Sequence, residues 1–290
     1  MEQIWQWGID VIIVVQQIRS PFFDDFFRTV SFFGTLIFYM LFLPILYWCF
    51  DKKNAVRIFI LFLISSWINS VMKDFINHPR PYNLNEAVKI GTTGGPGIPS
   101  GHAQQSLVVF GSLSLWLRNR IFTYGAVIFI FFIALSRIYL GVHFPTDILG
   151  GWFLGAALLI ILWPLFDRIE NFMSQVSPFI PASAAVAIPV LLSPVLASES
   201  SVMSMGAFSG FCVGIILEKK YIAFVPASGF KSGFYRYISG VFVLLTLYVS
   251  QKVLINKNTS NYLIFMFVHS WVLGIWVSAG APWLFKKIRI

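Results

Sequence analysis

The chain has 290 residues, of which 57% are hydrophobic and 11% are charged, and its mean hydropathy is +0.77. Soluble domains carry about 25% charged residues, so this composition excludes a water-soluble protein and indicates an integral membrane protein. Lys and Arg number 21 against 12 Asp and Glu, a net charge of +9. Because the basic residues are scattered between apolar runs, they favour a membrane-topology signal, and no nucleic-acid partner is expected.

Residues 1–28 precede the first long apolar run and mix Trp, Ile and Val with Gln, Asp and Arg. The stretch from Ile4 to Ser20 predicts a helix in the membrane interface, with its two Trp at headgroup level and its end at Pro21. The alternative is a helix end that faces the protein core. The segment has neither a basic n-region nor a small-residue cleavage site, so no cleavable signal peptide is expected.

Nine later segments have roughly the length and apolar content of a spanning helix, which needs about 20 residues. They are residues 30–50, 55–77, 101–117, 121–140, 147–166, 180–197, 202–217, 237–254 and 261–279. The segments 180–197 and 202–217 are short and contain Pro and Gly, so we expect eight to ten spans. The pattern predicts an all-α fold, a polytopic transmembrane helix bundle.

Three polar clusters interrupt the apolar runs, namely KDFINHPRP (73–81), PSGH (99–102) and SRIYLGVHFPTD (136–147). A charge beside a long apolar run is costly unless it is paired or functional. The clusters contain three cations, Lys73, Arg80 and Arg137. Together these cations could hold a dianion such as phosphate.

In the first cluster, Lys73 and Arg80 are seven residues apart, about two helical turns. We therefore expect them to share one face at the end of the second span, with Pro79 and Pro81 stiffening the backbone and ending the helix. Arg grips two phosphate oxygens through its planar fork, whereas Lys acts as a point charge. The alternative is a pair of cations that extend to the membrane interface.

The second cluster lies where a glycine-rich loop, residues 91–97, meets the third span. Ser100 is a natural helix N-cap, and Gly101 lets the backbone approach a ligand closely. The free N–H groups at this helix end predict an anion site. His102 lies in the first turn, where burial opposes its charge and a bound phosphate favours it. The alternative is a helix cap with an incidental histidine.

In the third cluster, Pro145 suits the first turn of the fifth helix, and His143 stands just before it. Asp147 follows His143 by four residues, so its carboxylate can reach one imidazole nitrogen. A histidine held in this way presents its other nitrogen as a nucleophile or base. The alternative is an aspartate favoured by the helix dipole beside a surface histidine. Arg137, at the same end, argues against that alternative.

The distribution of basic residues predicts the orientation in the membrane. If loop 51–57 is cytosolic and the spans alternate, the cytosolic segments hold thirteen Lys and Arg and the other side eight, of which three are Lys73, Arg80 and Arg137. This asymmetry fits the positive-inside rule. We therefore expect a multi-pass protein of the plasma (inner) membrane, with all three clusters on the extracytoplasmic side.

The order K-x6-RP, PSGH and SR-x5-H-x3-D resembles the type 2 phosphatidic acid phosphatase family, over roughly residues 20–166. The resemblance implies a six-helix core, made of the first five spans and a further N-terminal helix. It also implies a set of phosphate-binding groups: Lys73, Arg80, Ser100, the Gly101 amide and Arg137. It implies that His143 attacks phosphorus to form a phosphohistidine and that Asp147 orients it. His102 would protonate the leaving oxygen and then help to activate water.

The expected domains are an N-terminal interfacial or first core helix (1–29), the phosphatase core (30–167) and a C-terminal transmembrane extension (168–290). The sequence contains no carboxylate cluster of the usual kind for Mg²⁺ or Zn²⁺, so we expect a metal-independent enzyme without a cofactor. The expected substrate is a lipid phosphate, since the headgroup would meet the cations while the tail stays in the bilayer. Phosphatidic acid, phosphatidylglycerol phosphate, polyprenyl pyrophosphate and long-chain-base phosphates all fit.

Two alternatives stay open at this point. The strings TGGPGIPSGHA and SRIYLGVHFP also resemble the glucose-6-phosphatase branch, which favours a sugar phosphate, although Asp147 follows the lipid-phosphatase pattern. The extra spans after residue 168 resemble that branch and the sphingosine-phosphate phosphatases. A non-enzymatic lipid-binding or transport protein is the other alternative, but a transporter more often shows inverted repeats. The C-terminal spans could shield the core, form a homodimer surface or shape a substrate path, so the oligomeric state stays open.

Overall fold

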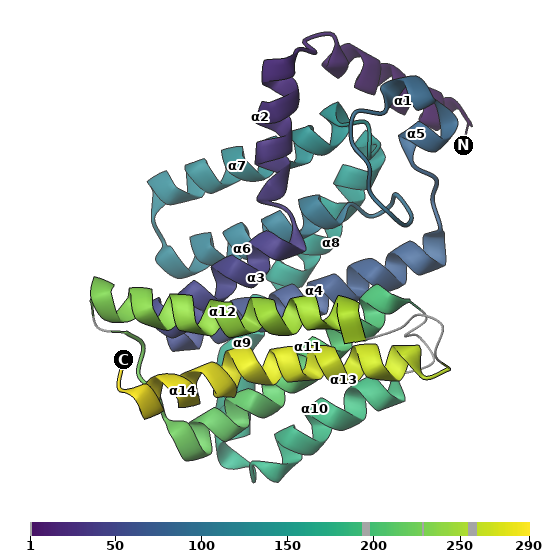
Figure 1. Ribbon diagram of the computed structural model, residues 1–290. Coiled ribbons are helices and arrows are strands. Elements are labelled where there is room, and N and C mark those ends of the chain that lie inside the picture. Colours follow the sequence, from purple (N-terminus) through teal and green to yellow (C-terminus); the bar gives the residue numbers. More distant parts are fainter. Residues whose placement is uncertain (1, 193–197, 228, 255–259) are drawn as a thin grey trace. The chain divides into compact units, whose positions relative to one another are not determined.

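The computed structural model describes residues 2–192, 198–227, 229–254 and 260–290 (Figure 1). Over these residues the chain forms helices joined by turns and loops, and none of them lies in a strand, which confirms the all-α prediction. The chain divides into unit 1 (Met1–Tyr39 and Ile68–Trp163) and unit 2 (Met40–Trp67 and Pro164–Ile290). The units interleave along the sequence, whereas the expected domains follow one another, and those boundaries stay a prediction.

Unit 1 begins with α1 (Glu2–Gln16) and α2 (Pro21–Phe32). The Ser20 hydroxyl caps α2 by accepting a hydrogen bond from the Phe23 amide at 3.4 Å, and Pro21 occupies the first turn. The expectation that Pro21 ends the first helix is therefore wrong. Proline suits the first turn of a helix because its missing N–H would have no intrahelical partner there.

One face of α1 packs against the rest of unit 1. Ile9 and Ile12 are buried in a cluster with Val88 and Phe144, and Trp5 packs against the same cluster. Trp7 is 50% exposed. The core-facing alternative therefore describes this face of α1, and the headgroup-level position of the two Trp stays a prediction.

The centre of unit 1 consists of α6 (Gly101–Leu117), α7 (Arg120–Tyr139) and α8 (Pro145–Leu162), with α2 beside α7. Gly151 and Gly155 of α8 allow α6 to approach closely. A Cβ atom at Gly155 would lie 3.1 Å from the Gln104 carbonyl oxygen, and one at Gly151 would lie 3.3 Å from the Ala103 Cβ. This close packing places the start of α8 beside the start of α6, where two of the polar clusters lie.

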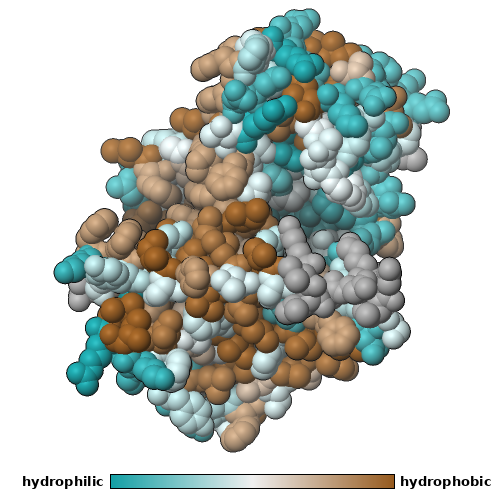
Figure 2. All heavy atoms as spheres, in the orientation of Figure 1, coloured by the Kyte–Doolittle hydropathy of each residue, from teal (hydrophilic) through white to brown (hydrophobic). Residues whose placement is uncertain are grey.

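The outer face of α7 is apolar. Its exposed large side chains recur with helical spacing, at Ile121, Tyr124, Val127, Ile128 and Phe131. In water such a stripe would be unfavourable, whereas in a bilayer it contacts acyl chains. In unit 2, Figure 2 shows apolar side chains over α12 (Phe230–Leu254) and α13 (Tyr262–Ile275).

The helix α4 (Lys52–Ile76) contributes its first part to unit 2 and its last part to unit 1. Its 25 residues extend about 37 Å at 1.5 Å per residue. The hydrocarbon core of a bilayer is about 30 Å thick. The helix α4 is therefore long enough to cross a bilayer.

Unit 2 also contains α9 (Phe166–Gln175), α10 (Phe179–Leu191), α11 (Glu199–Leu217) and α14 (Ala281–Ile288). The closest helix packing here is between α11 and α13. A Cβ atom at Gly206 would lie 2.5 Å from the Phe267 carbonyl oxygen, and one at Gly274 would lie 2.6 Å from the Phe211 amide. Small residues of this kind let membrane helices approach until their backbones touch.

Six helical segments among the described residues are long and apolar enough to span a membrane, and they confirm a multi-pass fold. They are Lys52–Leu84, Arg120–Tyr139, Pro145–Gln175, Glu199–Ile222, Phe230–Gln251 and Tyr262–Ile288. A seventh forms if α2 and the segment Leu36–Phe50, which bend by 52°, count as one span. This is fewer than the eight to ten expected, because α6 has 17 residues and α10 has 13. Residues 193–197 of one expected span, and Lys257 of the charge count, lie outside the described residues.

Candidate active site

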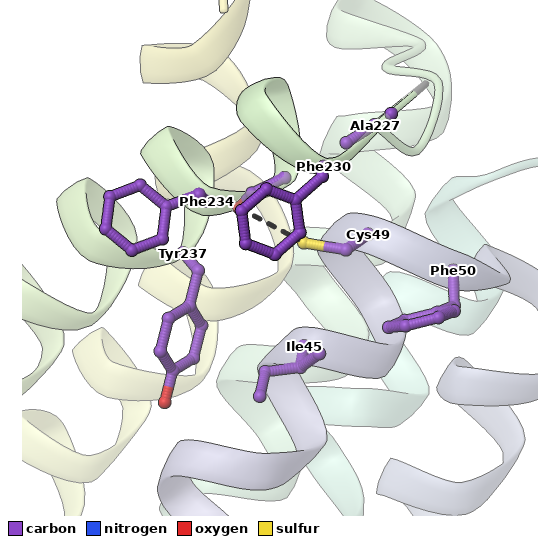
Figure 3. Close-up of a pocket in the computed structure, with 9 residues that line it drawn as sticks. Ile45, Cys49, Phe50, Ala227, Phe230, Phe234 and Tyr237 are labelled. Carbon is purple, nitrogen blue, oxygen red and sulfur yellow. Dashed lines mark hydrogen bonds between the residues drawn. The ribbon is translucent and has the colours of Figure 1, made fainter.

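Unit 2 contains a pocket of about 460 Å³ between the segments 45–50 and 227–237 (Figure 3). The side chains of Phe230, Phe234 and Tyr237 line it, and the Cys49 thiol beside them donates a hydrogen bond to the Gly233 carbonyl at 3.6 Å. None of its described lining residues is charged. This pocket therefore offers nothing that would neutralise a phosphate group, and the candidate site lies among the polar clusters of unit 1.

The helix that carries the first cluster, α4, ends within this cluster and before Arg80. Lys73 lies in the last turn of α4, which ends at Ile76, and Asn77 has a positive φ of 48°. Arg80 is extended, with φ −92° and ψ 157°, and precedes α5 (Pro81–Leu84). The expectation that Lys73 and Arg80 share one helical face is therefore wrong. A residue before proline avoids the helical region, so the backbone cannot stay helical as far as Arg80.

The glycine-rich loop brings the two cations together. Lys73 Nζ donates to the carbonyl oxygens of residues 96 and 97, at 2.6 and 3.1 Å. Arg80 donates from Nε to the Gly95 carbonyl at 2.7 Å and from Nη2 to the Gly94 carbonyl at 2.8 Å. The loop itself is tied back, because the Gly97 amide donates to the His78 carbonyl at 2.8 Å. Backbone carbonyl groups of this loop, and not a shared helix face, therefore hold Lys73 and Arg80 near each other.

The PSGH turn joins the second cluster to the third. The Ser100 amide donates to the Asp147 carbonyl at 2.9 Å, and α6 begins at the next residue. Ser100 occupies the N-cap position, but its side chain makes no capping hydrogen bond. Its hydroxyl is buried and has no hydrogen-bond partner among the described residues. The N-cap position of Ser100 is therefore confirmed without the capping hydrogen bond, and the hydroxyl is available to an oxyanion.

Asn69 fixes this turn, and sequence reasoning missed it. Its side-chain amide donates to the Gln104 side chain at 2.7 Å and to the Pro99 carbonyl at 3.3 Å. A Cβ atom at Gly101 would lie 3.3 Å from Asn69 Oδ1. The available signal was a polar residue within an apolar span, four residues before Lys73 and thus on the same face of α4.

Two more side chains, Arg137 and His102, each have a buried nitrogen atom without a hydrogen-bond partner among the described residues. Arg137 is 6% exposed, its Nη1 donates to the Ser31 hydroxyl, and its Nε has no partner among the described residues. His102 Nε2 is likewise buried without a partner in the described chain. Gly34 packs against the His102 ring, where a Cβ atom would lie 2.6 Å from Cδ2. Ser31 and Gly34 show that the end of α2 helps to build the site, which no sequence signal indicated.

His143 lies at the centre of the third cluster and is 2% exposed. Its Nδ1 lies 3.1 Å from Asp147 Oδ2, as the four-residue spacing predicts, and the same oxygen accepts a hydrogen bond from the Phe144 amide at 3.0 Å. His143 Nε2 lies 3.3 Å from Arg80 Nη1, which donates to the Val142 carbonyl at 2.8 Å. The ring nitrogen that does not face Asp147 therefore lies against the guanidinium group.

Burial lowers the pKa of His143 well below its usual value, and the charges of Arg137, Arg80 and Lys73 lower this pKa further. The ring is therefore neutral at pH 7, which is the form that a nucleophile or base requires. All three predicted cations act on this ring, so the fold gathers the three clusters into one site.

These helices and this site define a class: a multi-pass membrane protein with a cluster of cations around a neutral histidine that is held by an aspartate. Comparison with known proteins narrows the class. Residues 54–170 match the PAP2 superfamily, and residues 202–290 match the PAP2 superfamily phosphatase transmembrane extension. The chain therefore contains a PAP2 superfamily domain followed by that superfamily's transmembrane extension, which confirms the resemblance seen in the sequence. The first match contains all three polar clusters.

Parts of the chain are similar in sequence to named proteins. Sphingosine-1-phosphate phosphatase 2 of Mus musculus is 28% identical over 208 residues, which are 66% of this chain and 58% of that protein. A dihydrosphingosine 1-phosphate phosphatase of Schizosaccharomyces pombe is 30% identical over 181 residues, 58% of this chain and 44% of that protein. The chain thus spans little more than half of the first relative. The crystal structure of a Bacillus subtilis PAP2-type phosphatidylglycerolphosphate phosphatase matches with a TM-score of 0.51 at 19% identity, over 61% of this chain and 90% of that one. It supports the fold alone.

Proposed function

We propose that this protein is a membrane phosphatase that hydrolyses the phosphomonoester, or pyrophosphate, of a lipid phosphate through a phosphohistidine intermediate. One observation carries the proposal. A neutral His143 lies within the field of three cations, Lys73, Arg80 and Arg137. Asp147 holds the Nδ1 atom of its ring. Phosphoryl transfer needs in-line positioning and positive charge around the equatorial oxygens. The three cations would supply the charge, and His143 held by Asp147 would supply the positioned nucleophile.

In the first step, His143 Nε2 attacks phosphorus. Arg80 Nη1 is 3.3 Å from that nitrogen, so a phosphoryl group bound to Arg80 would lie next to the attacking atom. The bound phosphate favours the protonated form of His102. The ester P–O bond breaks as the N–P bond forms, and the leaving oxygen takes the proton from His102, which becomes neutral. Asp147 keeps the Nδ1 proton on His143 and stabilises the positive ring. The free Ser100 hydroxyl, the Gly101 amide and Arg137 complete the oxyanion contacts.

In the second step, water attacks the phosphohistidine. His102, now without its proton, takes a proton from the water as the O–P bond forms. The N–P bond breaks, which releases inorganic phosphate and returns His143 to its neutral form. The buried, unpartnered Nε2 of His102 suits a group that must both give and receive a proton at one site.

The setting of the site and the names of the relatives support the proposed substrate class. A cationic site bounded by apolar spanning helices suits a phosphorylated headgroup whose tail stays in the bilayer. Two relatives carry names of long-chain-base phosphate phosphatases, and we expect a long-chain-base phosphate to be the best substrate. The partners are therefore membrane lipids.

The first expected result is that the detergent-solubilised full chain releases inorganic phosphate fastest from a long-chain-base 1-phosphate. The panel comprises that lipid, phosphatidic acid, phosphatidylglycerol phosphate, a polyprenyl pyrophosphate and glucose 6-phosphate. A preference of about 10-fold or more corresponds to about 1.4 kcal/mol of transition-state binding. Faster release from glucose 6-phosphate would favour the sugar-phosphate alternative. Release from none of them would favour a lipid-binding or transport protein.

Activity should persist in excess EDTA and be inhibited by vanadate. No group of three or more His, Cys, Asp or Glu side chains that could hold a metal ion occurs among the residues that the structure describes. Vanadate mimics pentacoordinate phosphorus, and transition-state analogues bind about 10²-fold or more tighter than substrates. The measurement is phosphate release with and without EDTA. Loss of activity in EDTA that Mg²⁺ restores would contradict metal independence.

We place the site on the extracytoplasmic side, and single cysteines test this. Glu86 is exposed near the site, and Lys53 is exposed at the opposite end of α4. In a background with Cys49→Ala and Cys212→Ala, E86C should react with a membrane-impermeant thiol reagent in intact cells, whereas K53C should react only after permeabilisation. The reverse pattern would invert the orientation and expose the site to cytosolic sugar phosphates.

A further inference from the structure

His78 belongs to the first cluster, but the mechanism above does not use it. The Trp5 indole N–H donates to His78 Nε2 at 2.8 Å. An indole nitrogen can only donate, so Nε2 carries no proton and a neutral His78 carries its proton on Nδ1. That nitrogen lies 3.4 Å from Asp147 Oδ1. In this tautomer the N–H group of His78 therefore lies beside the carboxylate that holds the proposed nucleophile.

The two carboxylate oxygens of Asp147 have different surroundings. Oδ2 meets the His143 ring and the Phe144 amide. Oδ1 has no hydrogen-bond partner within the described residues, and His78 Nδ1 is equally unpartnered there. Asp147 is fully buried, and a buried carboxylate oxygen without a partner is costly. His78 is the group placed to satisfy it, and hydrogen bonds of catalytic sites often tighten only in the complex.

His78 is held rigidly enough to act on its neighbour. Its ring makes edge-on contacts with Trp5 and Phe144, at centroid distances of 5.8 and 5.6 Å. Gly97 packs against the pair, since a Cβ atom there would lie 3.0 Å from Asp147 Oδ2 and 3.4 Å from His78 Nδ1. The first helix is anchored as well, because Gln16 donates to the Val88 and Tyr139 carbonyls, each at 2.8 Å.

We propose that His78 is a positioning residue: its Nδ1–H holds Asp147 in the orientation that presents His143 Nε2 to phosphorus, and Trp5 sets the tautomer that makes this possible. The inference rests on the proposed function, because it assigns a part in that same reaction. His78 does not touch the phosphoryl group in this account. It should therefore influence the rate of the chemical step rather than the binding of the headgroup.

Substitution of His78 by asparagine or by glutamine separates its contact with Asp147 from its contact with Trp5. In His78→Asn the amide occupies the place of Nδ1 and can still donate to Asp147. In His78→Gln it occupies the place of Nε2 and meets only Trp5. We expect His78→Gln to lower kcat about 10- to 100-fold with KM within about 2-fold, and His78→Asn to stay within about 3-fold of the wild type. Trp5→Phe should lower kcat, whereas Trp7→Phe, a matched change at an exposed position of α1, should not.

A double-mutant cycle distinguishes positioning from a merely structural role. If His78 acts through Asp147, then adding His78→Gln to Asp147→Asn should change kcat by less than about 2-fold, because the pair is coupled. Equal losses in His78→Gln and His78→Asn, or full additivity with Asp147→Asn, would overturn the proposal.

A binding measurement keeps the test independent of turnover. Vanadate should bond to His143 Nε2 only when the ring is correctly held, whereas inorganic phosphate needs only the cations. In the solubilised full chain, His78→Gln should weaken vanadate binding about 10-fold and leave phosphate binding unchanged, and His78→Asn should change neither. If no lipid is hydrolysed but this difference appears, the proposed function fails and the positioning role stands. Unchanged vanadate binding in His78→Gln would overturn the positioning role.

Discussion

Phosphate release by His143→Ala should fall by at least about 10⁴-fold, to the uncatalysed background, because this substitution removes the atom that forms the bond to phosphorus. The fold should survive. The substitution leaves the backbone at position 143 in place. The hydrogen bond from the Ser100 amide to the Asp147 carbonyl does not involve the His143 ring. The measurement is phosphate release with the best lipid of the panel, at equal amounts of folded protein.

Asp147→Asn should lose less, about 10²- to 10⁴-fold, because it disturbs the orientation and tautomer of His143 but leaves the nucleophile in place. The matched control is His269→Ala. His269 lies in α13, where its ring nitrogen is 3.3 Å from the Ser250 hydroxyl, and its loss should leave the rate within about 2-fold.

The intermediate provides a direct readout. Rapidly quenched wild-type enzyme should carry an acid-labile phosphoryl label, which His143→Ala should lack. The depressed pKa of His143 also has a consequence for pH dependence. A lowered pKa keeps the ring neutral as the pH falls, so the acid limb of kcat/KM should lie below the range where an exposed histidine titrates. Normal turnover by His143→Ala would exclude the proposed mechanism.

Arg137→Gln should lower kcat/KM by about 10³-fold, the range found for arginines that stabilise a transferring phosphoryl group. The amide retains much of the shape but loses the charge and the fork. Arg120→Gln is the matched control, since Arg120 begins the same helix at an exposed position. That control should stay within about 2-fold of the wild-type rate.

The Arg137→Gln variant also distinguishes a loss of activity from a loss of stability. Arg137 has an unpartnered Nε within the described chain, and its charge and those of Lys73 and Arg80 all act on His143. Losing one of several crowded buried cations should not destabilise the fold, so the Tm without ligand should fall by no more than about 3 °C. Vanadate at 100 times its Kd should stabilise the wild type by about 2.7 kcal/mol and Arg137→Gln hardly at all. A large loss of Tm with unaltered vanadate binding would make Arg137 a structural residue.

The sequence by itself determined the class of protein and the local parts of the site. Composition excluded a soluble chain, and three polar clusters in a fixed order indicated the superfamily. The contact between His143 and Asp147 was predictable because four residues along one helical turn bring two side chains together whatever the rest of the chain does. Pro145 at the start of α8 was predictable for the same local reason.

Only the tertiary structure decided how the clusters meet. Lys73 and Arg80 are brought together by carbonyls of the glycine-rich loop and not by a shared helix face. The Ser100 amide donates to the carbonyl of Asp147, 47 positions away, and the Ser100 hydroxyl has no partner within the described residues. Trp5 and His78 are 73 residues apart. No local periodicity encodes such contacts, because they depend on how helices pack, and packing is set by the combined shape of many side chains rather than by spacing along the chain.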